Sequence, residues 1–357
     1  MPTADWTLIL CILGGGGLAL QAGMNGTLGT LSRTKLFASC WSFGSGCLPL
    51  LIYFLATMRG VEISRAYHDA PLYAHFGGIM GTIYVVTIVY LAPRLGAASL
   101  LSTAIASQMT TALLLDHFAW LGLERREASV GRVVGVLLTI FGVVVMMGGL
   151  EWVRRVLRSD QRPKSDEEHQ QQDMVMGDST KPDPIVNEPT TTTTTTTTKT
   201  QPKKPDWTLL FSILAGTSLG LQAAMNAQLG HYSTPAYSAL FSFSEGFILL
   251  LLLFLYDVTM GPTSRLDPPW TLNIVTTVPY WAWLGGFLGA AYVLIVTIAT
   301  PRLGAVTVLG TSVCAQVIAA VLCDHFGIVG LPVQKAGWER CVGAVVVVGG
   351  VVLITVL

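Results

Sequence analysis

The composition of the chain is typical of a membrane protein. It has 357 residues, of which 52% are hydrophobic and 12% are charged, and its mean hydropathy is +0.58. Soluble domains carry about 25% charged residues, so the composition argues against a soluble domain. The net charge of zero gives no electrostatic basis for binding nucleic acid.

Ten apolar runs follow one another along the chain. A helix needs about 20 apolar residues to cross a hydrocarbon core of about 30 Å. The runs lie near residues 8–28, 36–57, 73–92, 97–115, 131–150, 208–229, 237–256, 280–299, 304–322 and 338–357. They lack the alternation of membrane-spanning strands, and backbone groups in lipid must be satisfied within their own segment. The sequence therefore predicts an all-α integral membrane protein with ten transmembrane helices.

A polar segment separates the first five runs from the last five. Residues 151–205 hold much of the charge of the chain, several prolines and an unbroken threonine run, Thr190–Thr198. Such a segment cannot bury a core, which predicts a disordered low-complexity linker. The predicted organisation is a first five-helix repeat at 1–150, the linker at 151–205, and a second five-helix repeat at 206–357.

The two groups of five runs are copies of one unit. Residues 5–29 and 206–230 both begin with Asp-Trp-Thr and both contain Leu-Gln-Ala-x-Met-Asn. The sequence Pro-Arg-Leu-Gly-Ala occurs at 93–97 and again at 301–305. Because each unit has an odd number of spans, the second copy must run through the membrane in the opposite sense. This predicts two inverted repeats, an arrangement found in many secondary transporters.

The order of the repeated motifs resembles a known family. Each copy carries Leu-Gln-Ala-x-Met-Asn, Gly-Gly-x-x-Gly-x-x-Tyr, Pro-Arg-Leu-Gly-Ala, a glutamine in the fourth span and Asp-His-Phe at the end of that span. Together these resemble the drug/metabolite transporter superfamily, specifically its YdcZ-like branch of inner-membrane exporters. Bacterial members are similar to one half of this chain, so the chain resembles two such halves fused. The resemblance implies export of a small metabolite or drug-like solute, without naming the solute.

Four amide side chains recur at matching positions of the two first spans: Gln21, Asn25, Gln222 and Asn226. The spacing of four places both amides of each copy on one helix face. Inverted-repeat transporters bind substrate near the midplane between the repeats, so these residues are candidate substrate-binding groups. Hydrogen bonding between helices explains them equally well. The same two interpretations apply to a further pair in the fourth spans, Gln108 and Gln316.

One acidic residue, Glu245, lies well inside a predicted span, and its counterpart in the first copy is Ser45. An intramembrane carboxylate is costly and usually faces a cavity or a partner. Burial favours the protonated form, which suits a group that takes up and releases a proton. Glu245 is therefore the candidate coupling residue, and the alternative is a neutral side chain bonded to a neighbouring helix.

Asp-His pairs end both fourth spans, and an arginine begins both fifth spans: Asp116, His117, Asp324, His325, Arg132 and Arg340. Two ligands per copy, placed on opposite faces by the inversion, cannot form one metal site, which needs three or four converging ligands. The Asp-His pairs are therefore expected to anchor helix ends, and the arginines to lie at the membrane interface. The six cysteines lie in apolar runs without a CxxC pair, which favours buried small side chains over a disulfide or zinc framework.

The sequence predicts a gradient-driven transporter that alternates access between its two repeats, in the plasma membrane or an internal membrane. It contains no Walker A, HExxH, GxSxG or dinucleotide motif, so no metal and no cofactor is predicted and the protein is not expected to be an enzyme. The expected partners are a small-molecule substrate and the lipid bilayer. Two alternatives remain: a non-transporting membrane scaffold that interacts through its linker, and, less favoured, a membrane enzyme.

The positive charge after the fifth run predicts the orientation. Arg154, Arg155 and Arg158 follow that run directly, and positively charged flanks stay in the cytosol. Protease added outside sealed, right-side-out vesicles should therefore leave the linker intact, and permeabilised vesicles serve as the control. Cleavage in the threonine run from outside would reverse the orientation.

Overall fold

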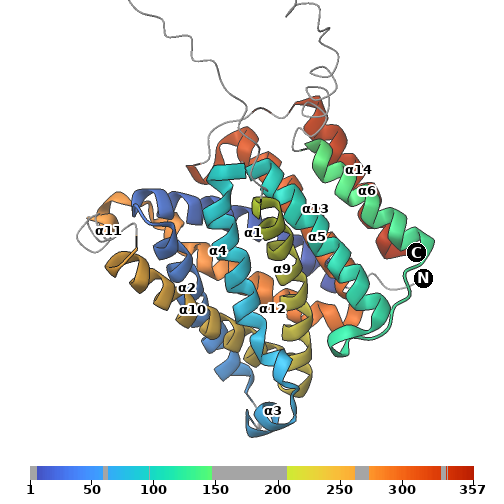
Figure 1. Cartoon of the computed structure of the whole chain (residues 1–357), viewed down its shortest axis with the longest axis horizontal. Coiled ribbons are helices and arrows are strands. Elements are labelled where there is room, and N and C mark those ends of the chain that lie inside the picture. The colour runs from blue at the N-terminus through green and yellow to red at the C-terminus, as the bar shows by residue number, and fades with distance from the viewer. Residues whose placement is uncertain are drawn as a thin grey trace, which may run out of the picture. The chain divides into compact units, whose positions relative to one another are not determined.

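The computed structural model describes residues 6–58, 63–95, 97–146, 207–261, 273–330, 335 and 337–357. The described regular structure is helical throughout (Figure 1). The first half comprises α1 (Trp6–Leu31), α2 (Lys35–Thr57), α3 (Ile63–Asp69), η1 (Leu72–Phe76), α4 (Gly77–Leu95), α5 (Ala97–Phe118), η2 (Trp120–Gly122) and α6 (Val130–Met146). The second half comprises α9 (Trp207–Tyr232), α10 (Pro235–Thr259), α11 (Ile274–Thr277), η5 (Tyr280–Leu284), α12 (Gly285–Leu303), α13 (Ala305–Phe326), η6 (Ile328–Gly330) and α14 (Trp338–Val356).

The helical fold class is confirmed, and seven of the described helices are long and apolar enough to cross a bilayer. These are α1, α2, α9, α10, η5 with α12, α13 and α14. The other three predicted spans coincide with α4, α5 and α6, whose described residues do not establish a full crossing by length and hydropathy. The predicted linker, residues 151–205, lies outside the described residues. The helices of both halves form one compact unit, Met1–Gly148 with Trp207–Leu357.

Equivalent helices of the two halves pack against each other in antiparallel pairs. In the pair α2–α10, the rings of Phe43 and Phe243 stack with their centroids 4.9 Å apart. Toward one end of α2 the ring of Phe37 contacts Phe254, and toward the other end Phe54 contacts Tyr237. Because the residue number falls on α10 as it rises on α2, the two helices run in opposite directions.

The helices α6 and α14 also lie side by side (Figure 1), and glycines form their contact. Gly135 lies against the carbonyl of Gly350, and Gly142 lies against the carbonyl of Gly343. Each contact leaves no room for a Cβ atom, so the two backbones touch directly. The order of these contacts again makes two equivalent helices antiparallel.

In the other large interfaces, the first helix of each half packs on helices of the other half. Helix α1 packs on α12 and α13 of the second half, and α9 packs on α4 and α5 of the first half. A Cβ at Gly15 of α1 would overlap the carbonyl of Ser312, and a Cβ at Gly216 of α9 would overlap the carbonyl of Ala104. Small residues at such crossings let helices approach closely where no water drives them together. Each half therefore inserts its first helix into the other.

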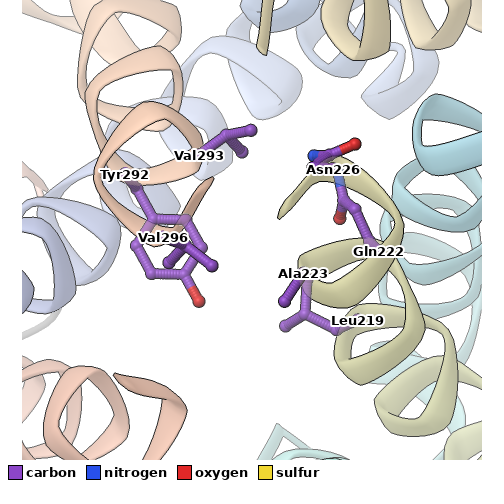
Figure 2. A pocket seen from close by; sticks show the side chains of 7 residues that line it. All are labelled: Leu219, Gln222, Ala223, Asn226, Tyr292, Val293 and Val296. Atoms are coloured by element: carbon purple, nitrogen blue, oxygen red, sulfur yellow. The ribbon is translucent and has the colours of Figure 1, made fainter. Parts of the chain in front are cut away.

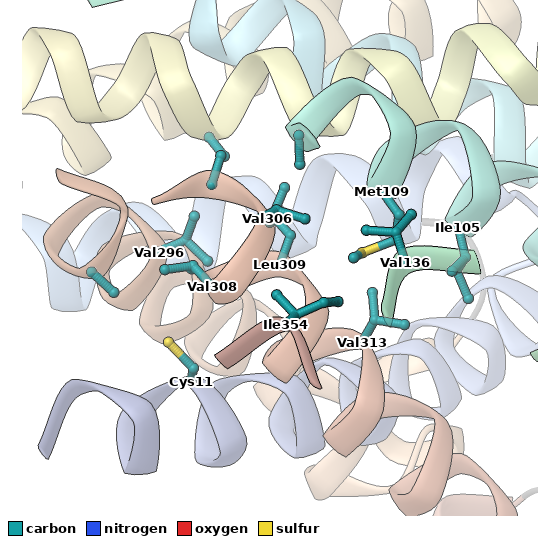
Figure 3. Packing of buried hydrophobic residues seen from close by; sticks show 14 of the residues in the cluster. Cys11, Ile105, Met109, Val136, Val296, Val306, Val308, Leu309, Val313 and Ile354 are labelled. Carbon is teal, nitrogen blue, oxygen red and sulfur yellow. The ribbon is translucent and has the colours of Figure 1, made fainter. Parts of the chain in front are cut away.

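The largest buried apolar cluster lies where these exchanged helices meet (Figure 3). It combines Cys11 of α1 and Met109 of α5 with Leu309 of α13, all of them at most 1% exposed. Val136 of α6 and Ile354 of α14 close the cluster from the antiparallel glycine pair. The core is thus shared between the halves, and neither half contains it alone.

The crossing of α9 on α5 gives a direct test of this packing. Gly216→Ala should lower the thermal stability of the detergent-solubilised protein, because the new methyl group would displace the Ala104 backbone. Overpacking of this kind costs about 1–3 kcal/mol. Gly26→Ala is the matched control on the equivalent helix, since a Cβ there meets nothing within 4 Å. Equal melting temperatures for the two variants would contradict the close crossing.

Candidate functional site

The first amide pair lies between α1, α2 and α12. Both Gln21 Nε2 and Asn25 Nδ2 donate to the hydroxyl oxygen of Ser42 on α2, each over 3.1 Å. The same side chains face α12, where a Cβ at Gly289 would lie 2.5 Å from Gln21 Nε2, and one at Gly285 would overlap Asn25 Oδ1. The two amides therefore fill the space that the α12 glycines leave. Their oxygens, Gln21 Oε1 and Asn25 Oδ1, are buried and have no hydrogen-bond partner among the described residues.

The second amide pair packs on the first half in the same way. A Cβ at Gly81 of α4 would lie 2.7 Å from Gln222 Nε2, and one at Gly77 would overlap Asn226 Oδ1. Both amide side chains are buried, with 5% of Gln222 and 2% of Asn226 exposed. Asn226 Oδ1 has no hydrogen-bond partner within the part of the chain that the structure describes. Each half thus inserts its amides into the glycine face of the third span of the other half.

The second amide pair lines a cavity in the part of the chain that the structure describes. Figure 2 shows Gln222 and Asn226 of α9 facing Tyr292, Val293 and Val296 of α12 across a small void. The void has room for roughly one water molecule. Gln21 and Asn25 are absent from its lining. The structure therefore brings Gln222 and Asn226 to a cavity and keeps Gln21 and Asn25 at a separate interface.

The two glutamines of the fourth spans lie in different surroundings. Gln108 is 4% exposed and its side chain lies close to that of Tyr292, the aromatic residue of the cavity wall. Gln316 is only partly buried. Neither Gln108 nor its repeat partner Gln316 belongs to the cavity lining, but Gln108 lies next to a residue that does.

Glu245 is on α10, and its side chain contacts the start of α4. The backbone N–H of Gly78 donates to Glu245 Oε2 over 2.8 Å, and the side chain is half-buried. Gly78 is the second residue of α4, where backbone N–H groups have no partner within the helix and favour negative charge. In the other half the equivalent glycine, Gly286, faces Ser45 and the carbonyl of Ser42. The carboxylate thus connects α10 to α4, and the hydroxyl of Ser45 occupies the matching place in the first copy.

A buried ion pair ties together the end of α5 and the start of α6. Arg132 Nη2 lies 2.9 Å from Asp116 Oδ2, and 7% of Arg132 and none of Asp116 is exposed. The guanidinium of Arg132 is therefore held inside the protein by a carboxylate that would otherwise be buried without a countercharge, and it does not extend to lipid headgroups as expected. The Nδ1 atom of His117 accepts a hydrogen bond from the backbone N–H of Ala128 over 3.2 Å, which fits the predicted role in anchoring the helix end.

Sequence reasoning overlooked two features of the site. Tyr292 ends the second copy of Gly-Gly-x-x-Gly-x-x-Tyr, and its hydroxyl-bearing ring forms a wall of the cavity. The signal was the repeat of that motif, since Tyr84 matches it in the first copy. The glycines of the motif are the second feature, because they receive the amides of the opposite half. Within the described residues no group of three or more His, Cys, Asp or Glu side chains is placed to hold a metal ion.

Comparisons with known proteins agree with this architecture. A family model described as "Putative inner membrane exporter, YdcZ" matches twice, at residues 6–145 and 207–353. A protein whose solved structure is described only as "Crystal structure of protein" shares 16% identity, covering 99% of this chain and 96% of that one with a TM-score of 0.59. At this identity the likeness speaks for the fold alone. No curated protein matched the sequence.

The two matches correspond to the two halves that the repeat predicted. The chain is a multi-pass integral membrane protein, and the family describes exporters, not enzymes. Through both of its halves, this chain belongs to the YdcZ family of inner membrane exporters.

Proposed function

We propose that the chain is a ten-span, gradient-driven exporter of a small metabolite or drug-like solute that alternates access between two inverted repeats. The observation that carries this proposal is the exchanged packing of the amide and glycine faces. Gln222 and Asn226 of one half lie on Gly81 and Gly77 of the other, so these contacts must change when one half moves against the other. Substrate sites of inverted-repeat transporters lie at such an interface.

The antiparallel pairing of equivalent helices supports the inversion. Gly135 against Gly350 and Phe43 against Phe243 each join matching positions of helices that run in opposite directions. Two copies of five spans give this relation only if the second copy enters the membrane from the other side. On this proposal α4, α5 and α6 are the three further spans, and repeats at 1–150 and 206–357 are joined by a linker at 151–205.

The cavity between α9 and α12 is the proposed solute site in a closed form. Gln222 and Asn226 offer hydrogen-bond donors and acceptors, and Tyr292 offers a hydroxyl group and an apolar ring. Ligand sites commonly combine a largely apolar wall with a few fixed polar groups. Gln108 lies beside Tyr292 and is proposed to support the site from there. Gln21 and Asn25 are proposed to take the equivalent part when the other side of the protein opens.

Glu245 is the proposed coupling group. As a carboxylate it accepts the Gly78 N–H and stabilises the positive end of α4. Proton uptake would remove that charge and weaken the hold of α10 on α4. Since α4 also carries Gly77 and Gly81, a change at Glu245 would be passed directly to the helix that receives Asn226 and Gln222.

The scaffold alternative predicts a different response to mutation of the amides and of Glu245. A non-transporting scaffold needs the amides only for packing, so it would tolerate changes at Glu245 that leave the fold intact. The enzyme alternative is less favoured, because the matching family is described as an exporter. A flux assay on reconstituted protein therefore separates transport from the scaffold role.

Glu245→Gln should abolish gradient-driven flux in proteoliposomes while solute exchange without a gradient remains measurable. Glutamine keeps the size of the side chain and can still accept the Gly78 N–H, but it cannot exchange a proton. Ser45→Ala is the matched control at the repeat-related position and should leave both measurements unchanged. Wild-type flux by Glu245→Gln would remove the coupling role and leave Glu245 as a packing residue.

Gln222→Ala should weaken solute binding roughly tenfold, about 1.4 kcal/mol, because it removes a buried hydrogen-bonding group from the cavity wall. Binding can be followed as solute-dependent thermal stabilisation across a panel of candidate solutes. Gln228→Ala is the control, since Gln228 is another buried glutamine of α9 that packs against Gly122 and not in the cavity. Equal effects of the two variants would place the solute elsewhere.

A further inference from the structure

Each fourth span ends near an aspartate that pairs with an arginine at the start of the fifth span, and these two Asp–Arg pairs are equivalent in sequence but not in structure. Asp116 and Arg132 are 16 residues apart, and so are Asp324 and Arg340. The first pair has an N–O distance of 2.9 Å and side chains that are 0% and 8% exposed. The second pair is looser, at 3.2 Å, with side chains that are 31% and 27% exposed. The same motif is thus buried in one copy and partly exposed to solvent in the other. We call the buried pair the closed form and the partly exposed pair the open form.

The closed form joins the two halves. Besides Arg132, the Asp116 carboxylate accepts the backbone N–H of Ala305 on Oδ1 over 2.7 Å and that of Val306 on Oδ2 over 3.1 Å. Those residues begin α13, so Asp116 of the first half caps the first turn of a helix of the second half. A neighbouring contact repeats the connection, because Arg126 Nη2 donates to the carbonyl of Arg302 over 2.7 Å.

The open form lies at the opposite end of the same helix pair. Asp116 ends α5 where α13 begins, and Met109 of α5 lies beside Gly310 of α13, so the two helices are antiparallel. Asp324 is near the far end of α13, where α5 begins at Ala97. By the 208-residue offset of the repeat, Ala97 and Ala98 are the positions equivalent to Ala305 and Val306.

We propose that the two Asp–Arg pairs are alternating latches, one closing each end of the protein. In this structure the Asp116–Arg132 latch is closed on the start of α13, and the Asp324–Arg340 latch is open. In the alternate state Asp324 caps the start of α5 and becomes buried with Arg340, while Asp116 and Arg132 open to water. This deepens the proposed alternating access and rests on it.

If one latch closes as the other opens, the transporter avoids the full free-energy cost of breaking a buried ion pair. Separating a buried carboxylate from its guanidinium and from two backbone N–H groups is strongly unfavourable by itself. When an equivalent set of contacts forms in the same motion, the loss at one end is offset at the other. Two end states built from the same contacts then have similar free energies, as alternation between them requires.

Hydrogen–deuterium exchange on the full-length protein in nanodiscs, without solute, tests the latches. Asp116→Asn should raise exchange at the amides of Ala305 and Val306 roughly tenfold, because asparagine lacks the charge that holds them. The same variant should slow exchange at residues 97–98, where the Asp324 latch would now close. Asp324→Asn should do the reverse at both places, and since its side chain is partly exposed it carries the test even if Asp116→Asn fails to fold.

The outcomes separate the latch from a simple helix cap. A local rise at residues 305–306 with no change at 97–98 would overturn the proposal, because a cap acts only on its own helix. The same shift in both variants would overturn it as well. Reciprocal shifts in a protein that shows no flux for any solute would keep the latches and reject transport. Measured flux without reciprocal shifts would keep transport and reject the latches.

Discussion

Direct contact between the backbones of the two halves is the constraint on which the other features of this structure depend. Gly15 lies on the carbonyl of Ser312, and Gly216 lies on the carbonyl of Ala104. Lipid chains are as apolar as the helix surfaces, so burial from water does not drive helices together inside a bilayer. Close packing has to supply the attraction, and it does so only where no side chain intervenes. The shared core around Met109 and Leu309 is a consequence, because each half inserts its first helix into the other.

The same constraint explains why amides and glycines occur together. Gln21 and Asn25 fill the space beside Gly289 and Gly285, and the second copy repeats this arrangement on α4. An amide is short enough to fit such a space and polar enough to bond a neighbour, as both amides of α1 do with Ser42. Packing and recognition are therefore not competing explanations for these residues. Within the described residues, the oxygens of Gln21, Asn25 and Asn226 at these contacts have no hydrogen-bond partner. On the proposed mechanism, the same groups would respond when the halves move.

Departures from symmetry distinguish the two ends of the molecule. Glu245 binds the Gly78 N–H at a place where the other copy offers only the hydroxyl of Ser45. Asp116 is fully buried and caps a helix of the opposite half, whereas Asp324 is partly exposed. On the proposed mechanism, contacts that are duplicated by the repeat would define two similar states, and residues that are not duplicated would make the two states respond differently. A chain in which both halves are fused can hold such differences, because each copy is free to change separately.

The sequence by itself determined the helical membrane class, the repeat and the family. These follow from hydropathy and from motifs such as Pro-Arg-Leu-Gly-Ala, which depend only on the order of residues along the chain. Tertiary structure decided which faces meet. The sequence placed Gln21 and Gln222 on matching helix faces, but it could not reveal that only Gln222 reaches the cavity, because that depends on how α9 crosses α12. The sequence suggested that the Arg132 side chain extends to the membrane interface. It is instead buried, because the end of α5 brings Asp116 within 2.9 Å of it. Local periodicity carries no information on such long-range contacts, which arise only when the helices of both halves pack together.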